Sequence, residues 1–204
     1  MNRFKPVNHC ASLLGLVLLL LPACGGGGSS TSTPPDQATT PPVHATTLTY
    51  SNPPATGYSL QADPASTNAG HLTLNLVGPA GTSAQGVSVF LSADPAAVSW
   101  SKATPTSYAT PGTVFNLGSG PQAFISKATA TGDLQIGIYQ KSGSITYTSA
   151  PIATLGLDLD PGSVSPGTVI TLVPTPGTRA VFIDQTGTVQ PMTTPIGIGK
   201  LVAN

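Results

Sequence analysis

Regular alternation of apolar with small or polar residues is the feature that most constrains the fold of this 204-residue chain. The alternation is clearest in five segments, residues 72–76, 87–91, 134–138, 155–159 and 169–173. A period of two places successive side chains on opposite faces of a strand, and one aliphatic face beside one polar face is typical of an antiparallel sheet. No stretch has helical spacing, and 23 glycines with 21 prolines disfavour long helices. The sequence therefore predicts an all-β fold of two packed antiparallel sheets.

The chain begins with a segment that has the composition of an export signal. Arg3 and Lys5 supply a positive start, residues 11–21 are mostly apolar, and Ala23 is the small residue before the expected cut. The apolar run is shorter than the roughly 20 residues that span a bilayer. We therefore predict that residues 1–23 are a signal peptide, removed from the mature protein.

Cys24 directly follows this cut, and the residues around it resemble the lipobox of bacterial lipoproteins. In that family the cysteine receives a diacylglyceryl group and becomes the first residue of the mature protein. The resemblance implies a membrane anchor at Cys24, although Pro22 stands where the family usually has Ala or Ser. The residue directly after the cysteine is Gly25 and not Asp, which resembles the lipoproteins that two-membrane bacteria send to the outer membrane. We therefore expect a lipid-anchored protein of the cell envelope at the outer membrane, with the periplasmic or surface face left open.

The composition changes twice after the predicted cut. Residues 24–45 are mainly Gly, Ser, Thr and Pro, which predicts a flexible tether behind the lipidated cysteine. Regular alternation occupies residues 46–204, enough for one domain with a single core. The predicted organisation is a signal peptide, a tether and one β-sandwich domain.

A second resemblance begins at residues 87–98, which read VSVFLSADPAAV. They resemble the cohesin segment in which an alternating strand runs into a Tyr-Asp-Pro turn, with Ala93 in the place of the aromatic residue. The later part of the chain resembles the order of elements in cohesins. Residues 132–140 resemble a strand and residues 151–159 an apolar strand. Residues 166–172 resemble the turn and strand that follow, and residues 197–202 the closing strand. The resemblance implies an immunoglobulin-like, jelly-roll sandwich of about nine strands.

The resemblance also implies binding functions. One sheet face of a cohesin captures a calcium-loaded dockerin, and carbohydrate-binding modules share the superfold. Our leading hypothesis is a membrane-anchored, non-catalytic lipoprotein whose cohesin-like domain binds or scaffolds another exported, dockerin-like protein. The alternative is a carbohydrate-binding lipoprotein whose partner is a polysaccharide. A third hypothesis is a structural component of the envelope that packs through its own edge strands.

The best candidates for a binding surface are Gln135 and Tyr139. Tyr139 has the opposite parity to Ile136 and Ile138, so we expect its ring on the solvent face of a strand whose other face is buried. Gln135 shares that solvent face. Trp100 is instead predicted to lie in the core.

The charge content argues against nucleic acid as a partner. Charged residues make up 7% of the chain, with seven basic and seven acidic side chains. A basic patch able to neutralise a row of phosphates is therefore not expected.

The sequence offers little for catalysis or metal binding. The acidic residues are all aspartates, and three precede proline in turn signatures where we expect the carboxylates to cap backbone N–H groups: Asp63, Asp94 and Asp160. Asp158 and Asp160 could share a strand face and bind calcium, but no further acid lies nearby. His44 and His71 are too few for a zinc site, and we find no nucleophile or cofactor motif. We predict no catalytic residues, no metal site and no cofactor, and therefore a protein that is not an enzyme.

Overall fold

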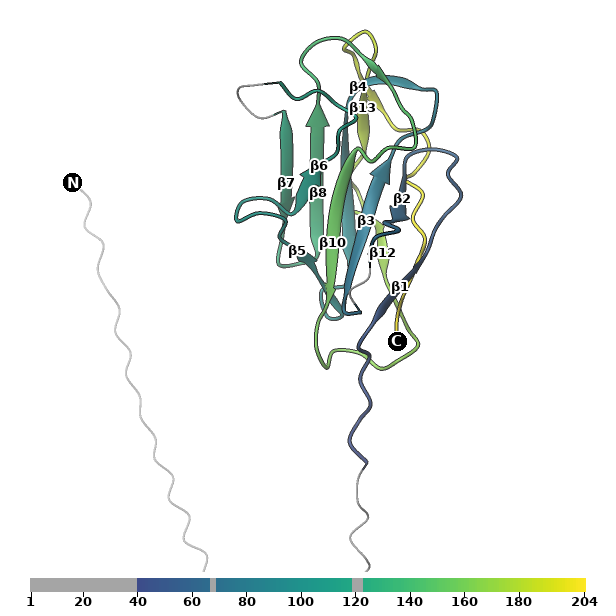
Figure 1. Cartoon of the computed structure of the whole chain (residues 1–204), viewed down its shortest axis with the longest axis vertical. Coiled ribbons are helices and arrows are strands. Elements are labelled where there is room, and N and C mark those ends of the chain that lie inside the picture. The colour runs from purple at the N-terminus through teal and green to yellow at the C-terminus, as the bar shows by residue number, and fades with distance from the viewer. Residues whose placement is uncertain (1–39, 67–68, 119–122) are drawn as a thin grey trace, which may run out of the picture. The chain divides into compact units, whose positions relative to one another are not determined.

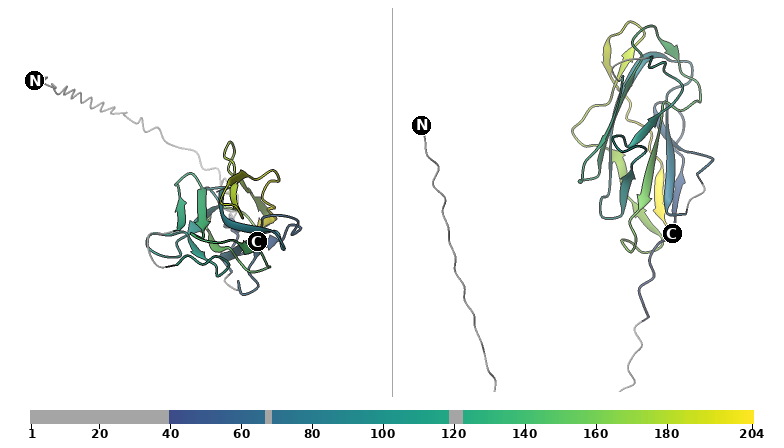
Figure 2. Two further views of the ribbon diagram at one scale, coloured as in Figure 1. Left: turned by 90° about the horizontal axis from the view of Figure 1, so that it is seen from above. Right: turned by 60° about the vertical axis from the view of Figure 1, so that its left-hand side comes forward.

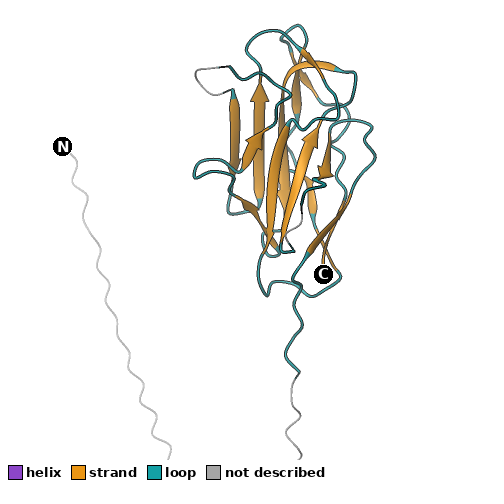
Figure 3. Cartoon of the chain, in the orientation of Figure 1, coloured by secondary structure: helices purple, strands orange, loops and turns teal. Residues whose placement is uncertain are grey.

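The computed structural model describes residues 40–66, 69–118 and 123–204, which form an all-β structure. Fifteen strands joined by loops and turns make up this part of the chain, and it contains no helix (Figure 3). The first eight strands are β1 (Leu48–Ser51), β2 (Ser59–Ala62), β3 (His71–Val77), β4 (Ser83–Ala93), β5 (Val98–Ser101), β6 (Ala109–Pro111), β7 (Phe124–Ala128) and β8 (Asp133–Tyr139). The others are β9 (Ile145–Thr146), β10 (Ala153–Leu159), β11 (Thr168–Ile170), β12 (Leu172–Pro174), β13 (Val181–Asp184), β14 (Val189–Pro191) and β15 (Lys200–Ala203). The all-β prediction is confirmed.

In these ranges there is no helix with the length and hydropathy needed to cross a membrane. The predicted signal peptide, Cys24 and the predicted tether up to residue 39 lie outside the described residues, so they stay predictions.

The strands form three sheets, and every pairing between them is antiparallel. The β4–β8 sheet has the order β14-β13-β4-β8-β7, with β12 and β9 also paired to β4. The β3–β10 sheet has the order β2-β3-β10-β5, with β6 also paired to β10, and a small sheet has the order β1-β15-β11. The two larger sheets face each other as the layers of a sandwich (Figures 1 and 2).

The core lies between these layers and is built by alternate residues of the long strands. Ile136 of β8 and Leu157 of β10, from opposite sheets, are fully buried and belong to one hydrophobic cluster. Burial of each such side chain stabilises the fold by about 1.5–3 kcal/mol. Four strands predicted from alternation are confirmed, at residues 72–76, 87–91, 134–138 and 155–159. Short additional strands raise the count above the nine expected.

The predicted single strand at residues 169–173 is wrong, because two strands occupy it. β11 pairs with β15 whereas β12 pairs with β4, so the chain changes sheet at Thr171. The carbonyl of Thr171 accepts a 3.0 Å hydrogen bond from the backbone N–H of Asp94 at this point. Ile170 and Leu172 are both buried, so the alternation continues across the break. Alternation shows which face is buried but not which neighbour a strand pairs with.

The predicted closing strand at residues 197–202 begins three residues late, at Lys200. A Cβ atom on Gly199 would lie 1.9 Å from the carbonyl oxygen of Ser51. This close approach of two chain segments requires glycine and precedes the regular pairing of β15 with β1.

Trp100 is buried, as predicted, and it joins the two layers. Its Nε1–H donates a 2.7 Å hydrogen bond to the carbonyl oxygen of Gly132, in the turn between β7 and β8. Gly132 has a φ of 86°, and a Cβ there would lie 2.1 Å from the carbonyl oxygen of Ala93. Glycine is therefore needed both for the turn and for the packing beneath it.

Candidate functional site

Gln135 and Tyr139 lie on the outer face of the β4–β8 sheet, as their parity predicts. Ile136 and Ile138 of the same strand point into the core and are buried, whereas the Tyr139 side chain is 42% exposed and Gln135 is half-buried. The structure therefore brings the two predicted residues onto one surface. That they bind a partner stays a prediction.

The two residues line a groove of about 300 Å³ on this face, which we call the outer groove. Residues of β4, β7, β8, β13 and β14 line it. The lining residues are Val87, Ser88, Ala123, Ile125, Gln135, Gly137, Ile138, Tyr139, Val181, Ile183 and Val189.

The outer groove is apolar and uncharged. Three of its side chains are large hydrophobic groups that remain exposed: Ile125 (47%), Tyr139 (42%) and Val189 (61%). Ser88 and Gln135 add a hydroxyl and an amide, and no lining residue carries a charge. Clustered exposed apolar side chains with a few polar groups are typical of an interaction site, whereas such side chains scattered singly are not.

Two outward-facing glycines shape the floor of the outer groove. Gly86 of β4 pairs with Tyr139 of β8, and a Cβ there would lie 2.5 Å from the Tyr139 Cβ. The missing side chain lets the Tyr139 stem pack directly on β4. Gly137 lies between Gln135 and Tyr139 on β8, and a Cβ there would meet only the Ser88 Oγ, at 3.7 Å. Gly137 therefore leaves open space that a larger side chain could fill.

The β13–β14 hairpin forms one wall of the outer groove. β13 pairs with the first half of β4, and Val181, Ile183 and Val189 of the hairpin face the groove. Phe182 points the other way, and its ring centroid lies 6.3 Å from that of Tyr58. The hairpin is thus held to the sandwich by both backbone pairing and an inward aromatic side chain.

The Asp184 carboxylate organises the turn of this hairpin. Its Oδ1 accepts hydrogen bonds from the backbone N–H groups of Thr186 (2.8 Å) and Thr188 (3.0 Å) and from the Thr186 hydroxyl (2.6 Å). Its Oδ2 accepts a 3.1 Å bond from the Gln190 side chain. The Thr186 hydroxyl, with Gln190 and Thr188, lowers the pKa of Asp184 to about 2.

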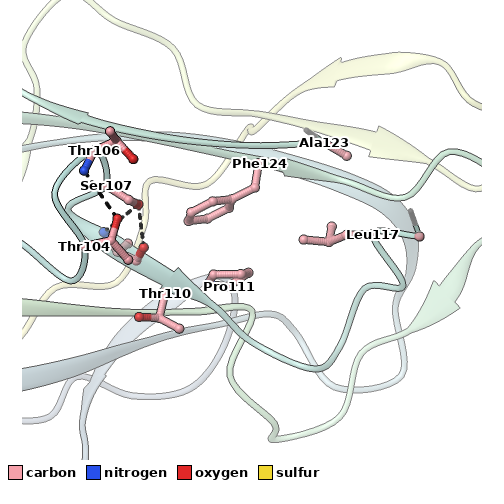
Figure 4. A pocket seen from close by; sticks show the side chains of 10 residues that line it. Thr104, Thr106, Ser107, Thr110, Pro111, Leu117, Ala123 and Phe124 are labelled. Atoms are coloured by element: carbon pink, nitrogen blue, oxygen red, sulfur yellow. Dashed lines mark hydrogen bonds between the residues drawn. The ribbon is translucent and has the colours of Figure 1, made fainter. Parts of the chain in front are cut away.

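A second cavity of about 310 Å³, the hydroxyl pocket, lies beside β6 and the start of β7. Figure 4 shows the Phe124 ring between the turn at Thr104 and Ser107 and the Leu117 side chain. Hydroxyl groups and apolar side chains both line this pocket, and no lining residue is charged. Its lining residues are Thr104, Thr106, Ser107, Ala109, Thr110, Pro111, Leu117, Gly118, Ala123 and Phe124.

A polar cluster on the outer face of the β3–β10 sheet joins His71, Ser101 and Asp158. His71 Nδ1 lies 2.5 Å from Asp158 Oδ1 and 3.3 Å from Ser101 Oγ, and that hydroxyl donates a 2.5 Å bond to Asp158 Oδ2. A catalytic triad needs the serine and the aspartate on different ring nitrogens, whereas here both contact Nδ1. The cluster therefore links three neighbouring strands and does not have the geometry that activates a nucleophile.

Two of the three predicted aspartate caps are confirmed. Asp63 and Asp94 each accept a 2.9 Å hydrogen bond from the backbone N–H two residues later. The prediction for Asp160 is wrong, because its carboxylate accepts a 3.0 Å bond from the hydroxyl of Ser99 on the neighbouring strand β5. Within the described ranges, no three or more His, Cys, Asp or Glu side chains are grouped to hold a metal ion.

Sequence reasoning missed the apolar partners of Tyr139 in the outer groove. Ile125 is one of two outward residues of a short strand, and Val189 belongs to a hairpin that does not alternate cleanly. The sequence held one local signal for this hairpin, Asp184 followed three residues later by Gly187. This pattern is typical of a turn, and Gly187 has a φ of 84° there.

No family model and no curated protein matches the chain. Its fold is similar to crystal structures of cohesins from Acetivibrio cellulolyticus. The sixth cohesin of scaffoldin B, in complex with a Cel5 dockerin mutant, aligns with a TM-score of 0.50 and 18% identity over 71% of this chain and 97% of that chain. The second type II cohesin module of the adaptor scaffoldin ScaA aligns with a TM-score of 0.50 and 13% identity over 78% and 97%. The described residues thus form a cohesin-like β-sandwich.

Proposed function

We propose that the chain is a membrane-anchored, non-catalytic lipoprotein whose cohesin-like domain binds another exported protein through the outer groove. The observation that carries this proposal is the cluster of exposed, uncharged side chains at Ile125, Tyr139 and Val189 on one sheet face. Burial of apolar surface drives protein association, and aromatic side chains such as Tyr139 are enriched where interfaces are strongest.

The comparisons support the class of partner. One of the similar cohesins is in complex with a dockerin. A dockerin-like module on an exported protein is therefore the first partner to test. The chain would act as an attachment point and not as a catalyst, and we propose no cofactor for it.

The anchor and the location are part of the same proposal. Cys24 carries the lipid, residues 1–23 are removed, and residues 24–45 hold the sandwich, residues 46–204, away from the outer membrane. We expect the full chain to fractionate with outer membranes and Cys24→Ser to abolish this. Radiolabelled palmitate should label the parent chain alone. Membrane attachment that persists in Cys24→Ser would overturn the anchor.

Photocrosslinking tests binding at the outer groove. A photoreactive phenylalanine derivative in place of Tyr139, in the full chain in intact cells, would link the groove to its occupant for identification by mass spectrometry. Gly137→Val fills the floor with a residue that strands favour and should lower the crosslinking yield at least tenfold. Thr49→Val, which places a valine at an exposed position of β1 away from the groove, is the control and should leave the yield unchanged. Equal yields in the two variants would contradict the proposal.

The hydroxyl pocket favours a second candidate function, the binding of a neutral sugar. Its threonine and serine hydroxyls can bond sugar hydroxyls, while the partly exposed Leu117 side chain can pack on the C–H surface of a sugar ring. Retention on insoluble polysaccharides tests this function. Thr110→Val removes one lining hydroxyl and should weaken retention, whereas Thr113→Val, outside the lining, should not. Absence of retention on any glycan would exclude this candidate.

A further inference from the structure

A third cavity, of about 360 Å³, lies at the end of the β13–β14 hairpin opposite its turn. Residues of the segments 174–180 and 192–196 line it together with Phe90 of β4. We call this cavity the arginine pocket, after Arg179 in its lining. It shares no lining residue with the outer groove or the hydroxyl pocket, so it is a separate site.

Hydrogen bonds hold the two lining segments in place. The backbone N–H of Thr175 donates a 3.0 Å bond to the carbonyl oxygen of Phe90, and that of Met192 donates a 2.9 Å bond to the carbonyl oxygen of Ala180. The hydroxyl of Thr178 donates a 2.7 Å bond to the carbonyl oxygen of Thr175 and closes the turn between them. The arginine pocket is therefore preformed, which lowers the entropic cost of binding a ligand.

Arg179 gives the arginine pocket a positive charge. It is the single charged residue in the lining, and it is exposed. The ion pair that the described residues form joins His71 and Asp158, so Arg179 is not paired with a carboxylate among them. The Asp133 carboxylate lies 3.5 Å from the Thr175 hydroxyl, but Asp133 does not line the pocket. The charge of the pocket therefore favours an anionic ligand.

The guanidinium group also favours one kind of anion. Its planar fork donates two parallel hydrogen bonds to the two oxygens of a carboxylate. One guanidinium balances the single charge of a carboxylate, whereas a phosphate monoester carries about two negative charges at neutral pH. A carboxylate therefore matches the charge of Arg179 better than a phosphate does.

The rest of the lining suits a sugar that carries this carboxylate. Thr193 and Thr194 are exposed and contribute hydroxyls that can bond the hydroxyls of a sugar ring. Half-buried Phe90 and Met192, with exposed Pro195, offer an apolar surface for the C–H face of the ring. A volume of about 360 Å³ is at the small end of the range of about 300–1,000 Å³ for ligand pockets. The arginine pocket thus combines the contacts that match the carboxylate, the hydroxyls and the C–H face of a uronic acid.

We propose that the arginine pocket binds a uronic acid unit of an acidic polysaccharide. Arg179 holds the carboxylate, Thr193 and Thr194 bond the ring hydroxyls, and the apolar side chains pack on the ring. This goes beyond the proposed function, because the pocket is separate from the outer groove and its ligand is a glycan and not a protein. It also differs from the neutral sugar considered for the hydroxyl pocket, because the ligand here must carry a negative charge.

Fluorescence anisotropy of labelled oligogalacturonate and oligomannuronate, titrated with the full chain in detergent, tests this proposal. We expect at least one of them to bind, and Arg179→Gln to weaken its binding at least tenfold. Lys141→Gln removes the same charge from an exposed residue outside the lining and should change the affinity less than twofold. Arg179→Lys keeps the charge without the planar fork and should give an intermediate loss. The methyl ester of the bound oligosaccharide should bind the parent chain at least tenfold more weakly, because it lacks the charge.

Three results would overturn the proposal. Neither oligosaccharide binds, or Arg179→Gln and Lys141→Gln weaken binding equally, which would show attraction to the overall charge and not to the pocket. The third is an oligoglutamate of the same length that binds as tightly, which would assign the pocket to an acidic peptide. Crosslinking from position 139 is independent of all three, so the proposed function stands or fails separately. Circular dichroism of each variant verifies that the sandwich is folded.

Discussion

At the scale of single residues, the Trp100 hydrogen bond is the clearest link between the two layers. The indole donates to the Gly132 carbonyl inside the core, and this carbonyl also accepts a 3.0 Å hydrogen bond from the backbone N–H of Ala93, so Trp100→Phe removes one of its two partners. We expect a loss of about 0.5–1.5 kcal/mol in the free energy of unfolding, measured by urea denaturation with circular dichroism. Tyr139→Phe, which removes an exposed hydroxyl, is the control and should change stability by less than about 0.5 kcal/mol. Equal losses in the two variants would refute the role assigned to Trp100.

Gly86 and Gly137, the two glycines in the floor of the outer groove, differ in whether a side chain fits in their place. Gly86→Ala brings a Cβ to 2.5 Å from the Tyr139 Cβ and 2.7 Å from the carbonyl oxygen of Ile138, so strand β8 must shift. In Gly137→Val the new Cβ lies 3.7 Å from the Ser88 Oγ, an ordinary van der Waals distance. We expect Gly86→Ala to lower the melting temperature by several degrees and Gly137→Val to leave it unchanged or higher, in thermal scans of both proteins. The reverse order would show that the described packing at Tyr139 is wrong.

At the scale of elements, the β13–β14 turn should respond to pH through Asp184. The Thr186 hydroxyl, followed by Gln190 and Thr188, lowers the pKa of this carboxyl from 3.8 to about 2. A depressed pKa means that the turn is stabilised fully above about pH 4, and that this stabilisation is lost as the pH falls through about 2. The amide resonances of Thr186 and Thr188 should therefore shift with a midpoint near pH 2, and Asp184→Asn should remove the midpoint. A midpoint at 3.8 or above would contradict the hydrogen bonds to this carboxylate.

The elements also show what the sequence could predict. Strands such as β8 and β10 bury one face only, so their period and their exposed residues, Tyr139 included, follow from parity. β13 has Phe182 packed inward while Val181 and Ile183 are apolar on the outward face, and therefore it shows no alternation. Its place beside β4 depends on contacts between residues almost a hundred positions apart, which a local pattern does not encode.

At the scale of the whole domain, a single core should make the sandwich unfold as one unit. Buried residues of the β4–β8 and β3–β10 sheets belong to the same hydrophobic cluster, and the small sheet contributes Leu201 to it. The chain passes from the small sheet to the β4–β8 sheet at residue 171, and the Trp100 hydrogen bond joins the β3–β10 sheet to the β7–β8 turn of the other layer. One layer therefore has no core of its own to retain when the other is lost.

Leu157→Ala tests this coupling. Leu157 is fully buried in the middle of β10, so the substitution should lower the free energy of unfolding by about 2–5 kcal/mol through lost burial and a new cavity. Because the core is shared, Trp100 fluorescence and far-ultraviolet circular dichroism should give coincident urea transitions in the parent protein and in the variant. Thr49→Val, at an exposed site, should leave both midpoints in place. Separate transitions for the two signals would show that the layers unfold independently.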